Sequence, residues 1–255
     1  MVVMAKPAVI LVGADKGGVG KTTVSRALLD YLIAHNVPTR AFDTESPKGT
    51  LRRFHPDITD VVDITSTPDQ MKIFDTLTNA DAQVTVIDIR AGLLSSTLKS
   101  LRDIGFLDAA AKTQITFTVF HILGPSIASL EEIGETAGFM NDAHYILVKN
   151  FINNTTFFEW DPATYNSYFR KIKDAHEITI PKLNEMACEQ VELASVPYVS
   201  FVANKDASGQ SAAFSFVLRG YVRHWLGNVW AEFDRVKLIG MVTPEQQRKG
   251  AARQA

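Results

Sequence analysis

The sequence has few cysteines, no long apolar run and almost no net charge. Cys188 is the single cysteine in 255 residues, so an intrachain disulfide is impossible and a metal cluster held by several cysteines of one chain is excluded. Such cysteine usage is typical of a reducing cytosol. The longest apolar runs, such as Ala8–Val12, are far shorter than the roughly 20 residues that cross a bilayer. The first residues also lack the long apolar segment of a signal peptide. We therefore predict a cytoplasmic protein without integral membrane association.

Length and charge limit the organisation of the chain. The formal net charge is −2, so any nucleic-acid contact would need a local basic patch. The apolar fraction of 46% is sufficient for a full hydrophobic core, and α/β chains of this length often form one domain. We predict a single domain over residues 1–242, with an inserted loop at about 152–163, followed by a flexible tail over 243–255.

Strand-like and helix-like segments alternate along the chain. Short apolar runs at 8–12 and 84–88 are typical of strands that are buried on both faces of a parallel sheet. Residues 22–35 carry apolar side chains at the three-to-four-residue spacing of a helix. Further strands are predicted at 39–42, 115–123, 145–148, 178–181 and, at the sheet edge, 198–202; further helices are predicted at 68–77, 96–104, 126–140, 165–176, 183–194 and 210–233. The pattern predicts an α/β fold with a mostly parallel sheet and helices on both faces, and ligands beyond the carboxyl ends of the strands.

A glycine-rich turn follows the first predicted strand. Residues 13–23 are Gly-Ala-Asp-Lys-Gly-Gly-Val-Gly-Lys-Thr-Thr and lie between a strand and a helix, as a phosphate-binding loop (P-loop) requires. Glycines let backbone N–H groups surround a phosphate, and the helix N-terminus adds donors and a favourable dipole. Lys21 would bridge the β- and γ-phosphates, and the Thr22 hydroxyl would complete a Mg²⁺ shell. The predicted nucleotide-binding residues of this loop are Lys16, Gly17, Gly18, Val19, Gly20, Lys21, Thr22 and Thr23. The alternative interpretation is a glycine-rich turn with two solvated lysines.

The loop departs from the strict P-loop pattern in an informative way. Asp15 stands where that pattern has glycine, and Lys16 is an additional lysine, so the match is K-G-G-x-G-K-T. This motif resembles the deviant Walker A families of SIMIBI-type P-loop NTPases, namely the ParA and MinD ATPases and, more distantly, the nitrogenase iron protein and the arsenite-pump ATPase. The resemblance implies ATP binding and an ATP-dependent homodimer in which Lys16 reaches the partner's nucleotide. The single cysteine argues against an iron–sulfur reductase, and the order of elements is more similar to plasmid-encoded and orphan ParA-like proteins.

An aspartate closes the predicted strand at 84–88. Asp88 can hold Mg²⁺ at the strand end, and Gly92 can offer its N–H group to a γ-phosphate. The run from Asp88 to Gly92 resembles the D-x-P-A-G element of MinD, with Arg90 in place of the proline. The alternative is a surface aspartate that begins a turn.

A second acidic motif closes the strand at 39–42. The segment from Asp43 to Gly49 resembles the first switch of ParA proteins, D-x-D-P-Q-G, with Asp43 matching the first acid and Glu45 the second. Glutamate replaces aspartate at the second position, Ser46-Pro47 replaces Pro-Gln, and one residue is inserted before Gly49. The resemblance implies that Asp43 or Glu45 orders the attacking water; Asp43 is also a candidate Mg²⁺ ligand. Because glutamate is longer, we expect slow turnover. The alternative is a strand-end turn with capping acids.

Two further positions resemble the base pocket of these families. Asn150 follows the strand at 145–148 and matches the asparagine that meets the purine edge, while Pro181 begins a loop similar to the one that covers adenine. Asn150 could equally be an ordinary polar strand end. The run at 204–206 lacks the N-K-x-D spacing of a GTPase, so ATP is favoured.

Basic residues late in the chain indicate possible partners. Arg219 and Arg223 lie one turn apart on the last long predicted helix, and Lys171 and Lys173 lie near the end of another. In ParA proteins such residues bind DNA without sequence preference; scattered solvated charges are the alternative. The tail is basic but has no apolar stripe, so the membrane-anchoring helix of MinD is not expected. An unidentified protein partner is also expected.

These observations predict an ATPase switch. ATP and Mg²⁺ would bind in the P-loop, Lys16, Lys21, Asp43 and Glu45 would carry the catalysis, and hydrolysis would loosen a dimer used in DNA partition or intracellular positioning. Two alternatives stay open: a small-molecule ligase or kinase of the same fold, of the dethiobiotin-synthetase type, and a nucleotide-binding scaffold that does not hydrolyse ATP.

Overall fold

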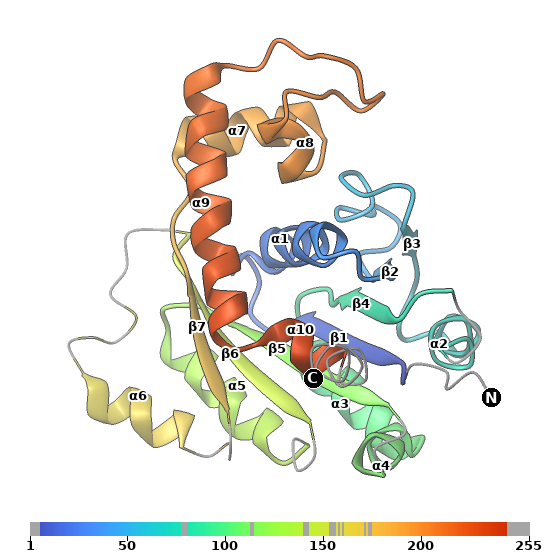
Figure 1. Ribbon diagram of the computed structural model, residues 1–255. Helices are drawn as coiled ribbons and strands as arrows, with labels where there is room; N and C mark the ends of the chain where they lie inside the picture. Colours follow the sequence, from blue (N-terminus) through green and yellow to red (C-terminus); the bar gives the residue numbers. More distant parts are fainter. Residues whose placement is uncertain are drawn as a thin grey trace, which may run out of the picture.

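A seven-stranded parallel sheet forms the centre of the molecule (Figure 1). The computed structural model describes residues 6–77, 81–112, 115–139, 143–152, 157, 159, 161–170, 172 and 175–243. In spatial order the strands are β3 (Thr59–Val61), β2 (Thr39–Asp43), β4 (Val84–Asp88), β1 (Ala8–Gly13), β5 (Thr116–Leu123), β6 (His144–Asn150) and β7 (His176–Ile180). All neighbouring strands pair in parallel, which confirms the predicted α/β fold.

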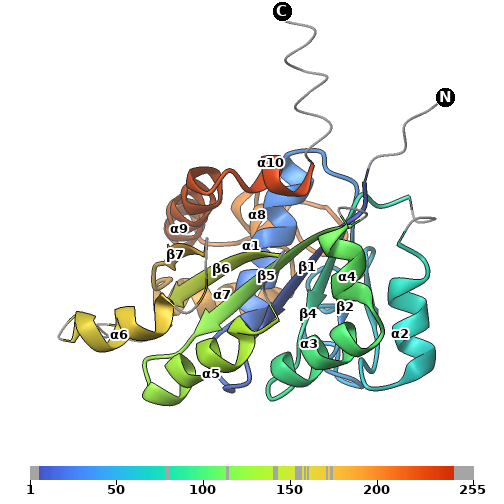
Figure 2. The same ribbon diagram turned by 90° about the horizontal axis from the view of Figure 1, so that it is seen from below.

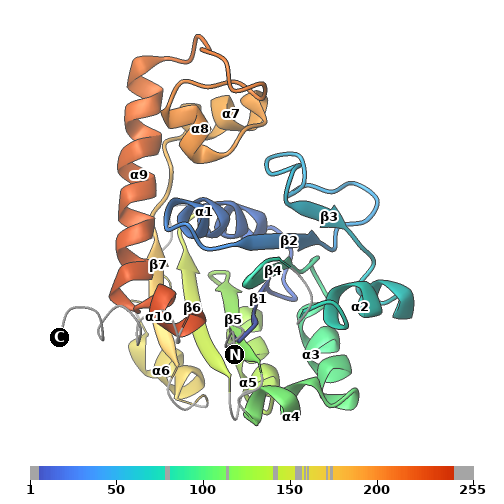
Figure 3. The same ribbon diagram turned by 45° about the vertical axis from the view of Figure 1, so that its right-hand side comes forward.

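Helices cover both faces of this sheet. One layer consists of α1 (Lys21–Ala34), α7 (Glu185–Ala194), α8 (Tyr198–Val202), α9 (Phe216–Arg235) and α10 (Leu238–Val242). The other consists of α2 (Thr67–Phe74), α3 (Leu94–Asp103), α4 (Phe106–Ala111), α5 (Ile127–Ala137) and α6 (Pro162–Phe169). Figure 2 shows α3, α4 and α5 in front of the sheet and α1 behind it. Figure 3 shows α9 running along β7, with α7 and α8 near its N-terminal end.

The two layers explain the uninterrupted apolar strands. In β1, Ile10 and Val12 pack into the core beneath α1, whereas Val9 and Leu11 pack into the core beneath α3 and α5. Successive side chains of a strand point to opposite faces, and both faces are covered here, so no position of β1 reaches water.

The connections from the strands to the helices that follow them leave room for a ligand at one edge of the sheet. The neighbouring strands β1 and β4 are followed by α1 and α3, which lie on opposite faces of the sheet. In open α/β sheets such a reversal leaves a crevice beyond the carboxyl ends of the two strands. The turn at 14–20 joins β1 to α1 at this place.

The predicted edge strand at 198–202 is wrong: this segment is helix α8. Tyr198 and Phe201 are its buried side chains, and their three-residue spacing places both on one face of a helix. The carboxylate of Asp30 on α1 accepts a hydrogen bond from the Val199 amide near the helix start. A segment of five mostly apolar residues is too short for periodicity to separate a helix from a strand.

Several helix boundaries also differ from the prediction. Helix α9 begins at Phe216 rather than at 210, because Ser215 caps it by accepting a hydrogen bond from the Leu218 amide. Helix α6 begins at Pro162, inside the predicted inserted loop, with Asp161 as its cap. The short elements β3, α4 and α10 were not predicted.

Some sequence predictions fall on residues outside the described part of the chain. These are Lys171 and Lys173, the tail from 244 onward, and positions 153–156, 158 and 160 of the inserted loop. The single-domain boundary at 242 stays a prediction. Among the described residues, no helix is both long and apolar enough to span a bilayer.

Candidate functional site

Eight of the predicted site residues converge on the crevice between β1 and β4. A cavity of about 260 Å³ lies there. Its walls are P-loop residues 18 and 20–23, Asp43 at the end of β2 with Glu45 after it, and Asp88 at the end of β4 with residues 89–91 after it. Segments from three neighbouring strands thus meet at one edge of the sheet.

Glycine is required in the loop by its backbone shape and by a close contact. Gly18 and Gly20 have φ angles of 72° and 85°, in the left-handed region that favours glycine. A Cβ on Gly20 would lie 2.2 Å from Nδ2 of Asn150. That nitrogen donates a hydrogen bond to the Val19 carbonyl at 2.9 Å. Asn150 therefore supports the P-loop from β6, and its predicted contact with a purine stays a prediction.

Lys21 is the lysine at the start of α1. Its ammonium donates a hydrogen bond to the Lys16 carbonyl at 3.3 Å, across the loop. Burial lowers its pKa, while the carboxylates of Asp88 and Glu132 act in the opposite direction. Within the described part of the chain this half-buried ammonium forms no ion pair, and a phosphate bound in the loop would supply one.

Asp88 is held by two hydroxyl groups of α1. Thr22 donates to its Oδ2 at 2.7 Å and Ser25 donates to its Oδ1 at 2.9 Å. Burial raises the pKa of Asp88 to about 7, with a further contribution from the nearby charge of Asp43, against hydrogen bonds that lower it. The strand register pairs Asp43 with Asp88, so two buried carboxyl groups are neighbours.

This donor set fits Mg²⁺. Among the described residues no group of three or more His, Cys, Asp or Glu side chains could hold a metal. Mg²⁺ does not need such a group, because it is usually bound by one or two carboxylates, waters and substrate phosphates. Thr22 and Asp88 offer a hydroxyl and a carboxylate beside the phosphate loop, and a divalent cation would offset the repulsion between Asp88 and Asp43.

Asp43 makes its hydrogen bonds with the chain that follows it. Its Oδ1 accepts from the Glu45 amide at 2.9 Å, and its Oδ2 accepts from the amides of Leu51 and Arg52 at 2.6 and 3.3 Å. The side chain is 1% exposed. Asp43 therefore organises the loop at 44–52, and its roles toward water and metal stay predictions. Glu45, which is half-buried at the cavity, accepts a hydrogen bond from the Thr50 hydroxyl.

Thr44, between these two acids, was not predicted as a site residue. Its hydroxyl donates to the Asp88 carbonyl at 3.0 Å and accepts from the Arg90 amide at 2.7 Å. The segments that follow β2 and β4 are therefore connected through one buried side chain. A rearrangement of either segment must therefore break these hydrogen bonds or move the other segment with it.

Lys16 is held by α5 of its own chain. Its ammonium donates to Oγ of Ser126 at 2.7 Å, and the carboxylate of Glu132 accepts from the amides of Asp15 and Lys16, both at 3.0 Å. Glu132 is buried, and its two oxygens fix the backbone at the start of the P-loop. Ser126 was predicted only as the first residue of a helix, and Glu132 was not predicted as a site residue.

A buried polar chain continues behind Glu132. His121 on β5 lies with Nε2 3.3 Å from Glu132 Oε2, and its Nδ1 contacts the Tyr145 hydroxyl. That hydroxyl is 2.8 Å from Oγ1 of Thr136. A fully buried histidine inside an apolar strand is unusual. Its position within the run at 115–123 was the one sequence signal that could have indicated this network.

Comparisons with known proteins resolve the fold. No family model and no curated protein matches the sequence. Among solved structures, a ParA family ATPase from Chlorobium tepidum TLS matches with a TM-score of 0.53, over 88% of this chain and 98% of that chain, at 14% identity. The chain has the fold of a ParA family ATPase. The MinD cell division protein of Aquifex aeolicus (TM-score 0.48, 13% identity, 87% of this chain and 97% of that chain) is also similar. So is a nucleotide-binding protein from Archaeoglobus fulgidus, solved in complex with ADP (TM-score 0.47, 17% identity, 72% and 85%).

The remaining predicted residues of this ParA-type fold lie at the margins of the site. Gly92 is exposed, with a φ angle of 82°, in the segment after β4. Pro181 follows β7, and its carbonyl accepts a hydrogen bond from the Trp225 indole at 2.6 Å. On α9, Arg219 donates to the Val202 carbonyl at 3.4 Å, whereas Arg223 is exposed. Only Arg223 of this pair therefore presents its charge fully to solvent.

Proposed function

We propose that this chain is an ATPase that hydrolyses ATP to ADP and phosphate with Mg²⁺ and acts as a dimeric switch. One observation carries the proposal: Lys21, Thr22 and Asp88 meet in one cavity beside a loop whose glycines have the backbone conformation of a phosphate nest. The ParA-type fold supports the same interpretation.

Each part of the site has a chemical task in this proposal. The loop amides and Lys21 bind the phosphates, and Thr22 and Asp88 hold Mg²⁺, which neutralises charge on the phosphates when it is bound. Glu45 orients the attacking water, because Asp43 already gives its oxygens to three backbone amides. Hydrolysis then changes the segments after β2 and β4 together, because Thr44 connects them.

Lys16 would couple nucleotide binding to dimerisation. In one protomer its ammonium makes a hydrogen bond to a neutral hydroxyl, that of Ser126. A hydrogen bond to a phosphate of the partner's nucleotide would be charge-assisted and roughly twice as strong. Lys16 would therefore leave Ser126 when two ATP-loaded chains meet.

The output of the switch would be DNA partition or intracellular positioning in the cytoplasm. Arg223 is a candidate for salt-sensitive contact with DNA phosphates, and a protein partner would read the nucleotide state. If Arg223 contacts one phosphate, Arg223→Ala should lower the slope of log affinity against log salt by about 1. Fluorescence anisotropy with a DNA duplex at two salt concentrations measures this slope.

Dimerisation tests the role of Lys16. Size-exclusion chromatography with light scattering should show a dimer with a non-hydrolysable ATP analogue and a monomer with ADP. Lys16→Ala should stay monomeric in both while still binding the analogue. Lys99→Ala changes an exposed lysine on α3 away from the cavity and should dimerise normally. Equal dimerisation of Lys16→Ala and wild type would instead favour a small-molecule ligase or kinase.

Phosphate release tests the hydrolysis. We expect a slow rate in the wild type and background release with Asp88→Asn, which removes the carboxylate charge at Thr22 and Ser25. Asp103→Asn, an exposed change at the end of α3, is the control and should keep the wild-type rate. Background release from the wild type itself would mean a scaffold that binds nucleotide without hydrolysing it.

A further inference from the structure

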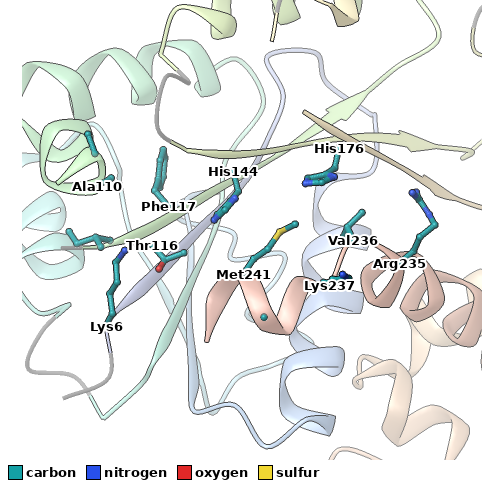
Figure 4. Close-up of a pocket in the computed structure, with 13 residues that line it drawn as sticks. Lys6, Ala110, Thr116, Phe117, His144, His176, Arg235, Val236, Lys237 and Met241 are labelled. Carbon is teal, nitrogen blue, oxygen red and sulfur yellow. The ribbon is translucent and has the colours of Figure 1, made fainter. Parts of the chain in front are cut away.

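A second cavity lies at the opposite edge of the sheet from the P-loop. Its volume is about 710 Å³, within the range of about 300–1,000 Å³ that is usual for small-molecule sites. Thr116, His144 and His176 line it, and these are the first residues of β5, β6 and β7. The end of α9 and helix α10 form the other wall (Figure 4). No step of the proposed ATPase uses this cavity.

The titratable side chains of this cavity are all basic. Lys6, His144, His176, Arg235 and Lys237 line it, and none of its lining residues is acidic. The charge of Arg235 is compensated, because this side chain forms an ion pair with Glu232 at 2.8 Å and also donates to the Glu177 carbonyl.

Two histidines and a lysine of this cavity have side chains that are unpaired among the described residues. Within the described part of the chain, the side chains of His144, His176 and Lys237 form no hydrogen bond or ion pair. Burial lowers the pKa of His144, and the nearby His176 and Lys6 lower it further, so a positive potential surrounds this imidazole. A bound anion would act in the opposite direction and favour the protonated imidazole.

The rest of the wall is apolar, with one polar exception. Phe117, Val236 and Met241 face the cavity (Figure 4). The Thr116 hydroxyl, on a residue that is 5% exposed, has no hydrogen-bond partner among the described residues. Sites for small organic molecules combine apolar walls with a few polar groups in this way.

We propose that this cavity binds a small organic anion. Its charged group lies beside His144, His176 and Lys237, and its apolar body lies against Phe117 and Met241. The nucleotide site is at the carboxyl ends of the strands and this site is at their amino ends, so the two ligands do not compete for space.

Phenyl phosphate is a suitable probe, because it joins a dianion to an apolar ring. The readout is the imidazole signals of His144 and His176 in carbon–proton NMR spectra of the whole chain, assigned with the variants His144→Gln and His176→Gln. Both signals should shift saturably with phenyl phosphate, while those of the other four histidines, His35, His55, His121 and His224, stay in place. Binding at the P-loop would leave the signals of His144 and His176 unchanged, so the result does not depend on the proposed ATPase activity.

A matched pair of variants completes the test. Lys237→Glu should weaken phenyl phosphate binding about tenfold or more, equivalent to about 1.4 kcal/mol. Lys99→Glu makes the same change at an exposed lysine outside the cavity and should leave the affinity within about twofold. The proposal is overturned if neither histidine signal shifts saturably up to about 10 mM probe. It is also overturned if both lysine variants lose affinity equally, or if neutral benzyl alcohol binds as tightly as phenyl phosphate.

Discussion

Replacing Glu132 with Gln changes one atom in the side chain that holds the start of the P-loop. The two carboxylate oxygens each accept a backbone N–H, from Asp15 and from Lys16, at 3.0 Å. A glutamine keeps one oxygen and places an NH₂ group against the other amide. Either orientation of the amide therefore leaves one donor facing a donor, in a residue that is 8% exposed.

The size of the effect follows from these two bonds. Hydrogen bonds to a charged group contribute about 1.5–3 kcal/mol each, and a buried donor without a partner costs about 1–3 kcal/mol. Glu132→Gln loses one such bond and weakens the other, so we expect the free energy of unfolding to fall by about 2–4 kcal/mol. Nucleotide affinity should fall as well, because the same backbone begins the phosphate nest.

Urea unfolding followed by circular dichroism measures the first quantity, and titration with a fluorescent ATP analogue measures the second. Glu131→Gln is the matched control, because it makes the same chemical change at an exposed neighbour on α5. If both variants unfold at the same urea concentration and bind the analogue equally, the two oxygens of Glu132 do not hold the loop and the argument fails.

Three other changes are informative. Gly20→Ala should abolish nucleotide binding in the same titration, because its Cβ would lie 2.2 Å from the side-chain Nδ2 of Asn150 and because Gly20 has a φ of 85°; unchanged affinity would contradict the close contact. Thr44→Val should lower the free energy of unfolding by about 1–3 kcal/mol, because it removes two hydrogen bonds of about 0.5–1.5 kcal/mol each, one from the Arg90 N–H and one to the Asp88 carbonyl; a urea midpoint equal to that of the wild type would refute this. Burial raises the pKa of Asp30 to about 7, above its value near 3.8 in an unfolded chain, so this group makes folding less favourable as pH rises from about 4 to 7 and adds no further change above. Asp30→Asn should flatten that part of the stability profile in urea unfolding at several pH values, and an unchanged slope would count against a neutral Asp30 in the folded chain.

Local sequence was sufficient where one short segment determines the outcome. The apolar run of β1 and the apolar spacing of α1 lie within about 30 residues, and they predicted the strand and the helix correctly. The glycines at 18 and 20 between them have the left-handed backbone that favours this residue. The acids at 43 and 88 were placed correctly for a similar reason, because each directly ends a buried strand, and parallel strands end at the same edge.

Local sequence did not predict the structure where a contact from a distant segment determines the conformation or the burial of a residue. Residues 198–202 are mostly apolar, as either a buried strand or a buried helix would be, and Asp30, which lies 169 residues before Val199, accepts the Val199 N–H at the start of the helix. Glu132 is one of two adjacent glutamates on α5, and only the packing of this helix against β5 and the P-loop shows which of them is buried.

The nature of the site was therefore encoded in short motifs, whereas its supports and its surroundings were not. Backbone conformation and strand ends depend on a residue and its near neighbours, so the glycine-rich turn and the two acids at the strand ends were visible in the sequence. Three features join segments that lie far apart in the chain. These are the hydrogen bonds from the loop to Glu132, the hydrogen bonds of Thr44 and the basic cavity at the amino ends of β5, β6 and β7. Hydrogen bonding and charge act over a few ångströms in space, whatever the separation in sequence, so only the folded chain brought these groups together.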